Sequence, residues 1–522
     1  MGKLRNTLAG RKGLKQKIRD TLARRQRRID ARLSPGRLGD CSQPMFAART
    51  IRYEIGGRQR GLSHGGIGAI HALVKHIGLV DAIDRRLKLF TFHLPYHESD
   101  HVLNLAYNAL CDGTCLQDID FRRNDEAFLD ALGVRRIPDP TTAGDFCRRF
   151  TPAHLEALQD AFDEVRQRVW REQTDPKFFD LAVIDMDGTI VETTGECKRG
   201  MDISYDGRWG YHPLLLTLNN TGEVLWLENR PGNRPSHEGA AKAVDRIVPM
   251  CRAGGFRKVL LRGDTDFSQT AHIDRWNADG VQFIFGYDAK ENLNQIADEL
   301  PTTDWQPLTR LPDYTIQTQP RPRPENVKDR IVKEREYETL KLKSEDVAEF
   351  VYRPTACAQA YRMVVVRKNI SVEKGEQVLF PQIRYFFYLT NVVTLDCHQI
   401  VAVANNRCDQ ENLLAQLHAG VNALTAPVNS LNSNGADMVM TALAWNLKAW
   451  WALMLPTPAG RWQDRHVEDK RRVLTMEFKA FAQAFIRLPC LIVRTGRKIV
   501  YRLLSWNPQQ PIFWRLISAL RC

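Results

Sequence analysis

Short hydrophobic segments that lead into aspartate set the strongest limit on the fold of this chain. The apolar run from Phe178 to Ile184 continues into Asp185-Met186-Asp187-Gly188, and the run from Lys258 to Leu261 continues into Gly263-Asp264. Apolar runs of about four to eight residues that are bounded by turn residues are typical of buried β-strands. The sequence therefore predicts two strands that each deliver acidic side chains where the strand runs out.

The segments around these two runs predict the rest of a sheet. Leu214 to Leu218 and Val224 to Leu227 flank Asn219-Asn220-Thr221-Gly222, which is typical of a hairpin. Further expected elements are a helix capped by Ser236 and extending to Met250, a helix from Phe267 to Ala278, and a strand from Val281 to Phe285. The order matches the ribonuclease H-like arrangement, in which three antiparallel strands lead into parallel ones. In that sheet the strands before Asp187 and Asp264 are neighbours.

Changes in composition divide the chain into six regions. The region 59–172 is expected to be helical and could be a DNA-binding domain or a plain helical packing domain. The predicted regions are a basic arm (1–58), this helical domain (59–172), the first part of an α/β core (173–290), a β-rich insertion (291–395), further core helices (396–455) and a basic C-terminal region (456–522).

Positive charge is concentrated at the N-terminus. Residues 1–40 contain thirteen Lys or Arg against three Asp, whereas the net charge of the whole chain is +13. Such a block usually marks a nucleic-acid-binding tail, although a solvated helix surface has the same composition. The predicted DNA contacts in the arm are Arg24, Arg25, Arg27 and Arg28.

The cysteine pattern and the most apolar stretch indicate where in the cell the protein is expected to act. The cysteines are scattered without a Cys-x-x-Cys motif, which fits a reducing cytoplasm better than a disulfide framework or a zinc ribbon. The most apolar stretch, Met438 to Leu455, contains Asn446 and Lys448 and is therefore expected to be a buried helix and not a membrane span.

Paired carboxylates at strand ends suit hard divalent cations. Two such ions about 3.5–4 Å apart can activate a water and stabilise the leaving oxygen of a phosphodiester. Asp187 and Asp264 are the preferred ligands, with Asp185 as the second choice for the first position. Taken singly, each aspartate could equally be a turn residue or a helix cap, and a cap before Phe267 is the preferred role for Asp266.

A third acidic residue is expected on a later helix. The segment Arg407 to His418 reads as helical, with Arg407, Glu411 and His418 on one face. Glu411 could form an ordinary ion pair with Arg407, or it could be a metal ligand flanked by groups that contact DNA phosphates.

Together these motifs resemble the DDE transposases of bacterial insertion sequences, in the subgroup that has a β-rich insertion before the catalytic glutamate. The resemblance covers roughly residues 60–510. The residues that carry it are Asp187-Gly-Thr, Asp264-Thr-Asp-Phe267, Arg407-x-x-x-Glu411, Gly210-Tyr-His-Pro-Leu-Leu, Arg230-Pro-Gly-Asn233 and Arg384-Tyr-Phe-Phe-Tyr-Leu-Thr-Asn391. The chain departs from the subgroup at Ala404 and His418, where the family has Tyr and Lys.

The resemblance implies a ribonuclease H-like core with Asp187, Asp264 and Glu411 as the catalytic and metal-binding acids. It further implies Mg²⁺ or Mn²⁺ as cofactor, as two ions, and Arg407 and His418 as DNA contacts. The expected activity is cleavage at the terminal inverted repeats of an element and joining of the 3′-hydroxyls to target DNA. The expected enzyme acts as a homodimer on DNA, in the cytoplasm and associated with the nucleoid.

Two other functions remain open from the sequence. One is a ribonuclease H-like nuclease that cuts without joining. The other is a catalytically impaired protein that binds element ends, which the departures at Ala404 and His418 motivate.

Overall fold

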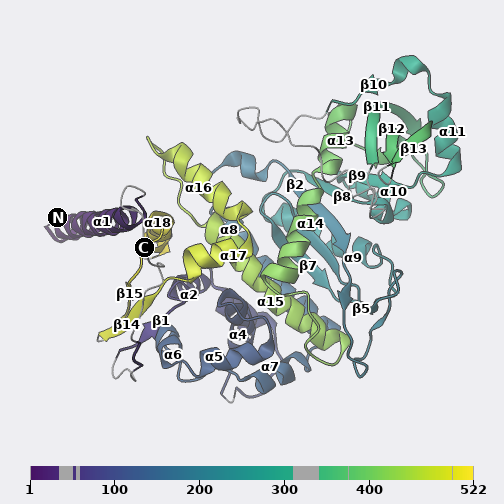
Figure 1. The fold of residues 1–522 in the computed structure, drawn as a ribbon. Helices are drawn as coiled ribbons and strands as arrows, with labels where there is room; N and C mark the ends of the chain where they lie inside the picture. The colour runs from purple at the N-terminus through teal and green to yellow at the C-terminus, as the bar shows by residue number, and fades with distance from the viewer. Residues whose placement is uncertain are drawn as a thin grey trace.

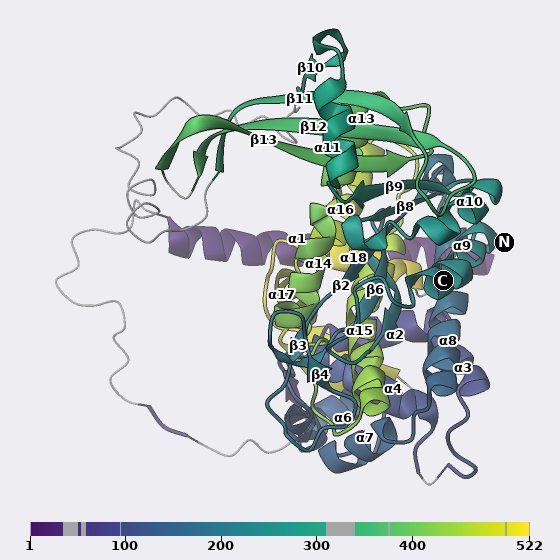
Figure 2. The same ribbon diagram turned by 90° about the vertical axis from the view of Figure 1, so that its right-hand side faces the viewer.

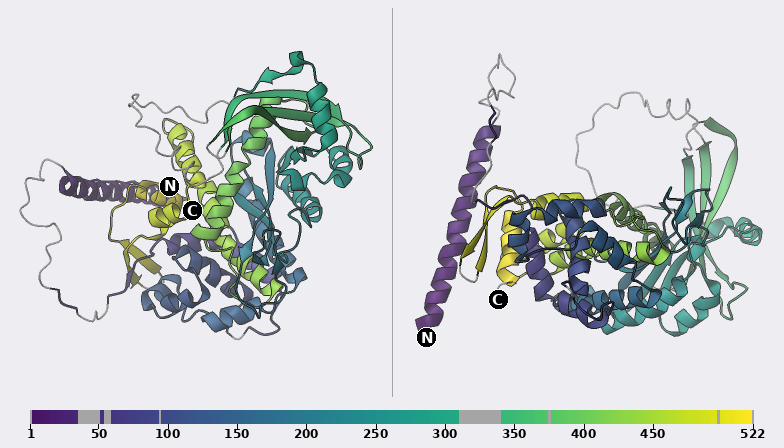
Figure 3. Two further views of the ribbon diagram at one scale, coloured as in Figure 1. Left: turned by 45° about the vertical axis from the view of Figure 1, so that its right-hand side comes forward. Right: turned by 90° about the horizontal axis from the view of Figure 1, so that it is seen from below.

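A helical N-terminal third, a large mixed sheet and a C-terminal group of helices make up the protein (Figure 1). The computed structural model describes residues 2–34, 51–53, 59–93, 95–309, 340–373, 376–495 and 498–520. The basic arm lies partly outside these residues. Within them it forms one long helix, α1 (Gly2–Leu33), which projects beside the body of the protein (Figure 3).

The helical prediction for residues 59–172 is confirmed. After the short strand β1 (Gly61–Leu62), the helices are α2 (Ile67–His76), α3 (Leu79–Arg86), α4 (Glu98–Leu110), α5 (Ile119–Arg123), α6 (Glu126–Leu132), α7 (Pro140–Cys147) and α8 (Pro152–Arg171). Helix α8 begins where the sequence requires it, because the Thr151 hydroxyl accepts a hydrogen bond from the amide of His154 and Pro152 occupies the first turn.

Nine strands form the central sheet in the order β10-β11-β12-β13-β9-β8-β2-β6-β7. Strand β2 pairs antiparallel with β6 and parallel with β8, which in turn pairs parallel with β9. The predicted neighbourhood of the strands that bear Asp187 and Asp264 is therefore confirmed. The bounds are β2 (Ala182–Gly188), β6 (Leu214–Leu218), β7 (Glu223–Glu228), β8 (Val259–Gly263), β9 (Gln282–Tyr287), β10 (Gln306–Pro307), β11 (Leu340–Tyr352), β12 (Tyr361–Glu373) and β13 (Glu376–Thr390).

A small second sheet lies beside the central one. It consists of β3 (Val191–Glu192), β4 (Asp202–Ile203) and β5 (Trp209–Tyr211) in the order β3-β5-β4. These strands lie between β2 and β6 in the chain, which was not expected from the sequence.

Three predicted boundaries are wrong. Strand β2 begins at Ala182, because Pro176–Phe179 forms a 3₁₀ turn that is capped by Asp175. The helix expected from Ser236 starts at Ala240 as α9 (Ala240–Ala253). The guanidinium of Arg230 donates hydrogen bonds to the carbonyls of Pro235, Ser236 and Glu238, which holds this segment out of a helix.

The third boundary concerns the region after β8. A 3₁₀ turn, η4 (Thr265–Phe267), precedes α10 (Thr270–Ala278), and Asp264 caps that turn by accepting a hydrogen bond from the amide of Asp266 at 3.0 Å. The cap role expected for Asp266 therefore belongs to Asp264.

The β-rich insertion extends the central sheet. After α11 (Glu291–Glu299), strands β10 to β13 continue it, and β13 pairs antiparallel with β9 (Figure 2). Helix α13 (Cys397–Asn405) covers one face of the added strands, where Ile400 and Val401 pack in one buried cluster with Val364 and Val366. The insertion thus shares a core with the strands that carry the acids.

Further helices and two strands follow the insertion. They are α14 (Cys408–Ala415), the π-helical turn η6 (Gln416–Gly420), α15 (Leu431–Leu453), α16 (Gln463–Thr475) and α17 (Phe478–Phe481), followed by η7 (Ala482–Ile486), the strands β14 (Cys490–Thr495) and β15 (Lys498–Leu503), and α18 (Gln510–Leu520). Helix α15 contacts α4, α8 and β7, and it is buried along nearly its whole length. The prediction of a buried helix there is confirmed. Among the described residues, the chain forms no helix with the length and apolar character of a membrane span.

Candidate active site

Asp187 and Asp264 lie at the same edge of the central sheet. Asp187 is the sixth residue of β2, and Asp264 directly follows β8. The parallel register pairs Asp185 with Arg262, so its continuation by two residues sets Asp187 opposite Asp264. The two carboxylates therefore converge, as strand ends in a parallel pair require.

Glycines allow the close packing at this edge. A Cβ at Gly188 would lie 2.6 Å from Nε2 of His212, and a Cβ at Gly286 on β9 would lie 2.9 Å from the amide nitrogen of Thr265. His212 is buried, and its Nδ1 bonds with the Arg234 carbonyl at 2.8 Å, so its ring is fixed in place. Gly188 is thus needed because the His212 ring fills the space where a side chain would stand.

Asp185 is engaged elsewhere. Arg262 donates to its two oxygens at 2.6 and 2.7 Å, and the amide of Asn219 donates at 3.1 Å. The Asp185 side chain is 1% exposed, compared with 16% for Asp187. Burial raises the pKa of the Asp185 carboxyl, and the hydrogen bonds from Arg262 oppose this shift. Of the two aspartates, Asp187 is the one that faces open space.

The two carboxylates at the edge carry an unfavourable charge in the absence of a cation. Burial raises the pKa of Asp187 to about 6; the guanidinium of Arg407 opposes this, while the charges of Asp264 and Glu411 add to it. Burial also raises the pKa of Asp264, again opposed by Arg407. The negative charges of the three acids thus act on one small region.

Helix α14 brings the remaining predicted residues to this edge, although its form differs from the expectation. The helix predicted across residues 407–418 begins at Cys408 after a break at Asn406 and Arg407, and it ends in the π-helical turn η6. Arg407 Nη1 lies 3.3 Å from Asp187 Oδ2. Glu411 is exposed on the first turns of α14.

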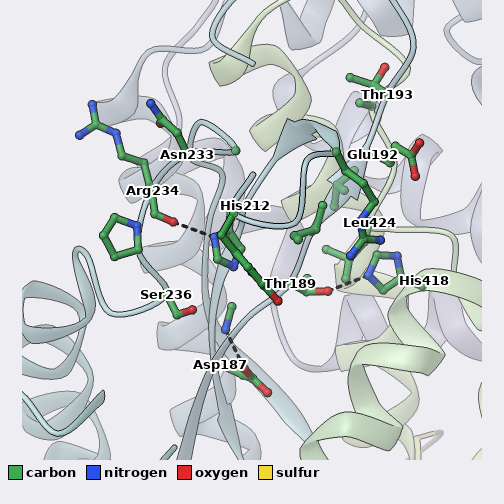
Figure 4. A pocket seen from close by; sticks show the side chains of 18 of the residues that line it. Asp187, Thr189, Glu192, Thr193, His212, Asn233, Arg234, Ser236, His418 and Leu424 are labelled. Atoms are coloured by element: carbon green, nitrogen blue, oxygen red, sulfur yellow. Dashed lines mark hydrogen bonds between the residues drawn. The ribbon is translucent and has the colours of Figure 1, made fainter. Parts of the chain in front are cut away.

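His418 reaches the site from the π-helical turn. Its Nε2 lies 3.0 Å from the Thr189 hydroxyl, one of the contacts that Figure 4 shows, and burial lowers its pKa. Ala404 is half-buried and packs against the apolar cluster beneath α13. Neither position supplies a permanent charge.

A cavity of about 1040 Å³ opens in front of the acids. Asp187 and His418 line it (Figure 4), as do Asp264 and Thr189 of the quoted motifs. Side chains that the sequence did not single out as site residues also line it, namely Glu192, Tyr205, Arg208, Arg234 and Ser236. Arg234 directly follows the Arg230-Pro-Gly-Asn233 motif, so the motif was the available signal for this wall of the cavity.

The arm arginines divide into two groups. Arg24, Arg27 and Arg28 are exposed on α1. Arg25 is half-buried, and its guanidinium donates hydrogen bonds to the carbonyls of Ser505 at 2.8 Å and Leu503 at 3.1 Å. Arg25 therefore docks the helix on the C-terminal segment, and the other three face solvent.

Comparison with known proteins gives one extensive match. The sequence profile of the family described as "Transposase DDE domain group 1" matches residues 43–522. No curated protein matches the chain. Among solved structures, it is similar to a piggyBac transposase in a synaptic complex with hairpin DNA, at 11% sequence identity and a TM-score of 0.35, over 80% of this chain and 81% of that chain.

Proposed function

This chain belongs to the family of transposases with a group 1 DDE domain, and on that premise we propose that Asp187, Asp264 and Glu411 are its catalytic acids. Members of this family are enzymes that cleave and transfer DNA strands, so the protein is a DNA transposase. The observation that carries the assignment is the convergence of Asp187 and Asp264 at one sheet edge, where both line one cavity. Glu411 does not line the cavity, but it lies near enough for its charge to raise the pKa of Asp187.

We propose that the core is ribonuclease H-like. The consecutive strands β7-β6-β2-β8-β9 support this, because three antiparallel strands lead into parallel ones. The proposed division of the chain keeps residues 173–290 and 396–455 as the two parts of this core, with 291–395 as its insertion.

The donor set fits hard divalent cations. Carboxylate oxygens are the ligands that such ions prefer, and the raised pKa values of Asp187 and Asp264 indicate negative charge that lacks sufficient compensation. We propose Mg²⁺ or Mn²⁺, as two ions held by Asp187, Asp264 and Glu411. Bound there, the ions supply activation of the attacking hydroxyl and stabilisation of the leaving oxygen.

Arg407 is proposed to change partners when DNA binds. In the free protein its guanidinium faces Asp187 at 3.3 Å, which is long for a charge-assisted hydrogen bond. With Asp187 serving as a metal ligand, the Arg407 guanidinium would be available to bind a phosphate beside the cleaved bond. His418, held by Thr189, is the second proposed phosphate contact.

The proposed substrates are the terminal inverted repeats of an element and a target DNA. Because two ends are cut in one event, we propose that two copies act together as a homodimer on DNA. The exposed Arg24, Arg27 and Arg28 of α1 supply a sequence-independent DNA contact. The eight cysteines whose side chains the structure describes are free thiols, which supports the proposal that the protein acts on the nucleoid in a reducing cytoplasm.

The test uses DNA that carries both borders of the reading frame, incubated with the enzyme and Mg²⁺. Asp187→Asn, Asp264→Asn and Glu411→Gln are expected to abolish end cleavage while DNA binding persists. Asp279→Asn, an exposed carboxylate at the end of α10, is the matched control and should cut normally. Cleavage by all three site variants would overturn the assignment, and pre-cleaved ends that are never joined would indicate a nuclease.

A further inference from the structure

A hairpin contributes to the rim of the cavity. We call residues 202–211, which comprise β4, β5 and the turn between them, the rim hairpin. Tyr205 and Arg208 in its turn line the same cavity as Asp187 and Asp264. Within the rim hairpin, Tyr205 and Arg208 therefore face the same space as the two acids, whereas Ile203 and Trp209 lie next to it without lining the cavity.

The rim hairpin exposes large apolar side chains. Tyr205 is 87% exposed, Trp209 is 51% exposed and Ile203 is 46% exposed. Ile203 pairs directly with Trp209 across β4 and β5, so these two side chains share one face of the small sheet. An aromatic side chain buries about 150–250 Å² when it is covered, so leaving two exposed in five residues has an energetic cost. Such a group usually marks a binding surface.

The exposure does not come from a loosely held loop. The buried Ser204 hydroxyl donates to the Asp206 carboxylate at 2.5 Å and accepts from the Arg208 amide at 3.0 Å. Arg208 Nε donates to Asp206 at 2.7 Å, and Gly207 takes the positive φ of 83° that the turn requires. Behind the hairpin, the Tyr211 hydroxyl accepts a hydrogen bond from buried Asn434 of α15. The turn is therefore held in one conformation, and the exposure of Tyr205 within it is a fixed property of the surface.

We infer that the rim hairpin is a stacking platform for the bases of an unpaired DNA strand that leaves the active site. Flat aromatic side chains and guanidinium planes are the groups on which unpaired bases stack, whatever the base. The inference rests on the proposed function, since strand cleavage beside Asp187 and Asp264 is what places an unpaired strand in this cavity.

Charge favours DNA over a protein as the occupant. Arg208 and Arg234 both line the cavity, and their side chains are 49% and 50% exposed. Arg234 is paired with one half-exposed carboxylate, that of Glu238, at 3.5 Å, so a phosphate can compete for it. Aromatic rings next to exposed guanidinium groups match the alternation of base and phosphate in a single strand.

The experiment measures binding of a branched DNA duplex of arbitrary sequence with 2-aminopurine in its unpaired arm, in the presence of Ca²⁺. Wild-type enzyme is expected to change the fluorescence of the 2-aminopurine and to bind the branched DNA more tightly than the fully paired duplex. Tyr205→Ala and Trp209→Ala should each weaken binding of the branched DNA by roughly 5- to 150-fold and abolish the fluorescence change. Binding of the paired duplex should be unchanged.

Tyr205→Phe keeps the ring and should retain the fluorescence change. Phe121→Ala removes a similarly exposed aromatic, 70% exposed on α5, and is the matched control. Retention of the fluorescence change in both Tyr205→Ala and Trp209→Ala would overturn the inference. A loss of self-association in these variants, without any effect on DNA binding, would also overturn it and would assign the surface to a second copy of the chain. The fluorescence readout needs no cleavage, so a negative result in it is distinct from a failure of the proposed function. A failure of the proposed function would appear as wild-type enzyme that does not cut end-bearing DNA.

Discussion

Arg262 and Asp185 form a buried ion pair with two contacts, at 2.6 and 2.7 Å, directly behind the proposed metal ligands. The same guanidinium donates at 2.7 Å to the carbonyl of Val403 in α13. One side chain thus connects β2, β8 and the helix that precedes Arg407. The relative positions of all three proposed acids depend on elements that this guanidinium holds together.

Removal of one partner of this pair is expected to be costly. Arg262→Met leaves the Asp185 carboxylate buried without its ion pair, and a loss of about 3–5 kcal/mol in the free energy of unfolding is expected. The double variant Arg262→Met with Asp185→Leu should recover most of that loss, because no charge is then left buried. Denaturant titration of the three proteins measures the effect. Additive losses in the double variant would contradict the predicted coupling.

The raised pKa of Asp187 predicts a pH-dependent gain in stability on its neutralisation. The folded pKa of about 6 lies above the unfolded value of about 3.9, so the ionised carboxylate destabilises the metal-free protein above pH 6. Asp187→Asn should therefore stabilise the metal-free protein by up to about 3 kcal/mol at pH 7. The gain should shrink as the pH falls through 6 and vanish below about pH 4, where both proteins are neutral at this position. Thermal unfolding across this range, with and without Mg²⁺, tests it; Mg²⁺ should stabilise wild type more than the variant.

His418→Lys is expected to strengthen the grip on cleaved DNA ends. Burial lowers the pKa of His418, so the imidazole is neutral at pH 7, whereas a lysine at this position carries a charge. The expected result is tighter binding of DNA. The slope of the logarithm of the binding constant against the logarithm of salt concentration should also steepen, by up to about the amount that one phosphate contact contributes. Thr189→Val, which removes the hydrogen bond to His418 without adding charge, should leave that slope unchanged. An equal slope in wild type and the lysine variant would show that residue 418 meets no phosphate.

Gly188→Ala is expected to damage the edge of β2. The new Cβ would lie 2.6 Å from the fixed His212 ring, and overpacking of this kind costs about 1–3 kcal/mol. His212→Ala makes room for the methyl group, so the double variant should be less destabilised than the sum of the two single variants. Free energies of unfolding for the four proteins complete the cycle. Simple additivity would mean that the two side chains do not meet.

The exposed arginines of α1 and the docked Arg25 are expected to have different functions. Replacement of Arg24, Arg27 and Arg28 by alanine should weaken binding of DNA of any sequence. The salt dependence of binding should fall by up to about the amount that three phosphate contacts contribute. Arg25→Ala removes hydrogen bonds to Ser505 and Leu503 and should instead expose α1 to limited proteolysis. Cleavage of the Arg25→Ala arm at the wild-type rate would contradict the docking role.

Local patterns predicted the strands that bear the acids, because apolar runs that end in aspartate are short-range signals. The order of the elements predicted that β2 and β8 are adjacent strands, and their parallel pairing confirms this. The late start of α9 was not predictable in this way, since it depends on the side chain of Arg230 reaching carbonyls several residues along the chain. Long-range contacts of this kind leave no periodicity in the sequence.

The same limit applies to the candidate site. Asp187, Asp264, Glu411 and Arg407 could be named from motifs, and their assignment as catalytic groups stays a prediction. The partner of Asp185 could not be named, because Arg262 lies on another strand, 77 residues along the chain, and no local pattern connects the two residues. The rim hairpin was also missed: Tyr205 and Trp209 are exposed, and a single sequence does not distinguish an exposed aromatic from a core residue.

The docking of α1 has a consequence for the chain during its synthesis. Arg25 is made 478 residues before Leu503 and 480 residues before Ser505, whose carbonyls it binds. The arm must therefore remain undocked until these residues have been made, with its arginines available to nearby nucleic acid. A product that terminates before Leu503 would keep this state permanently and would compete for DNA without the segment that restrains the arm.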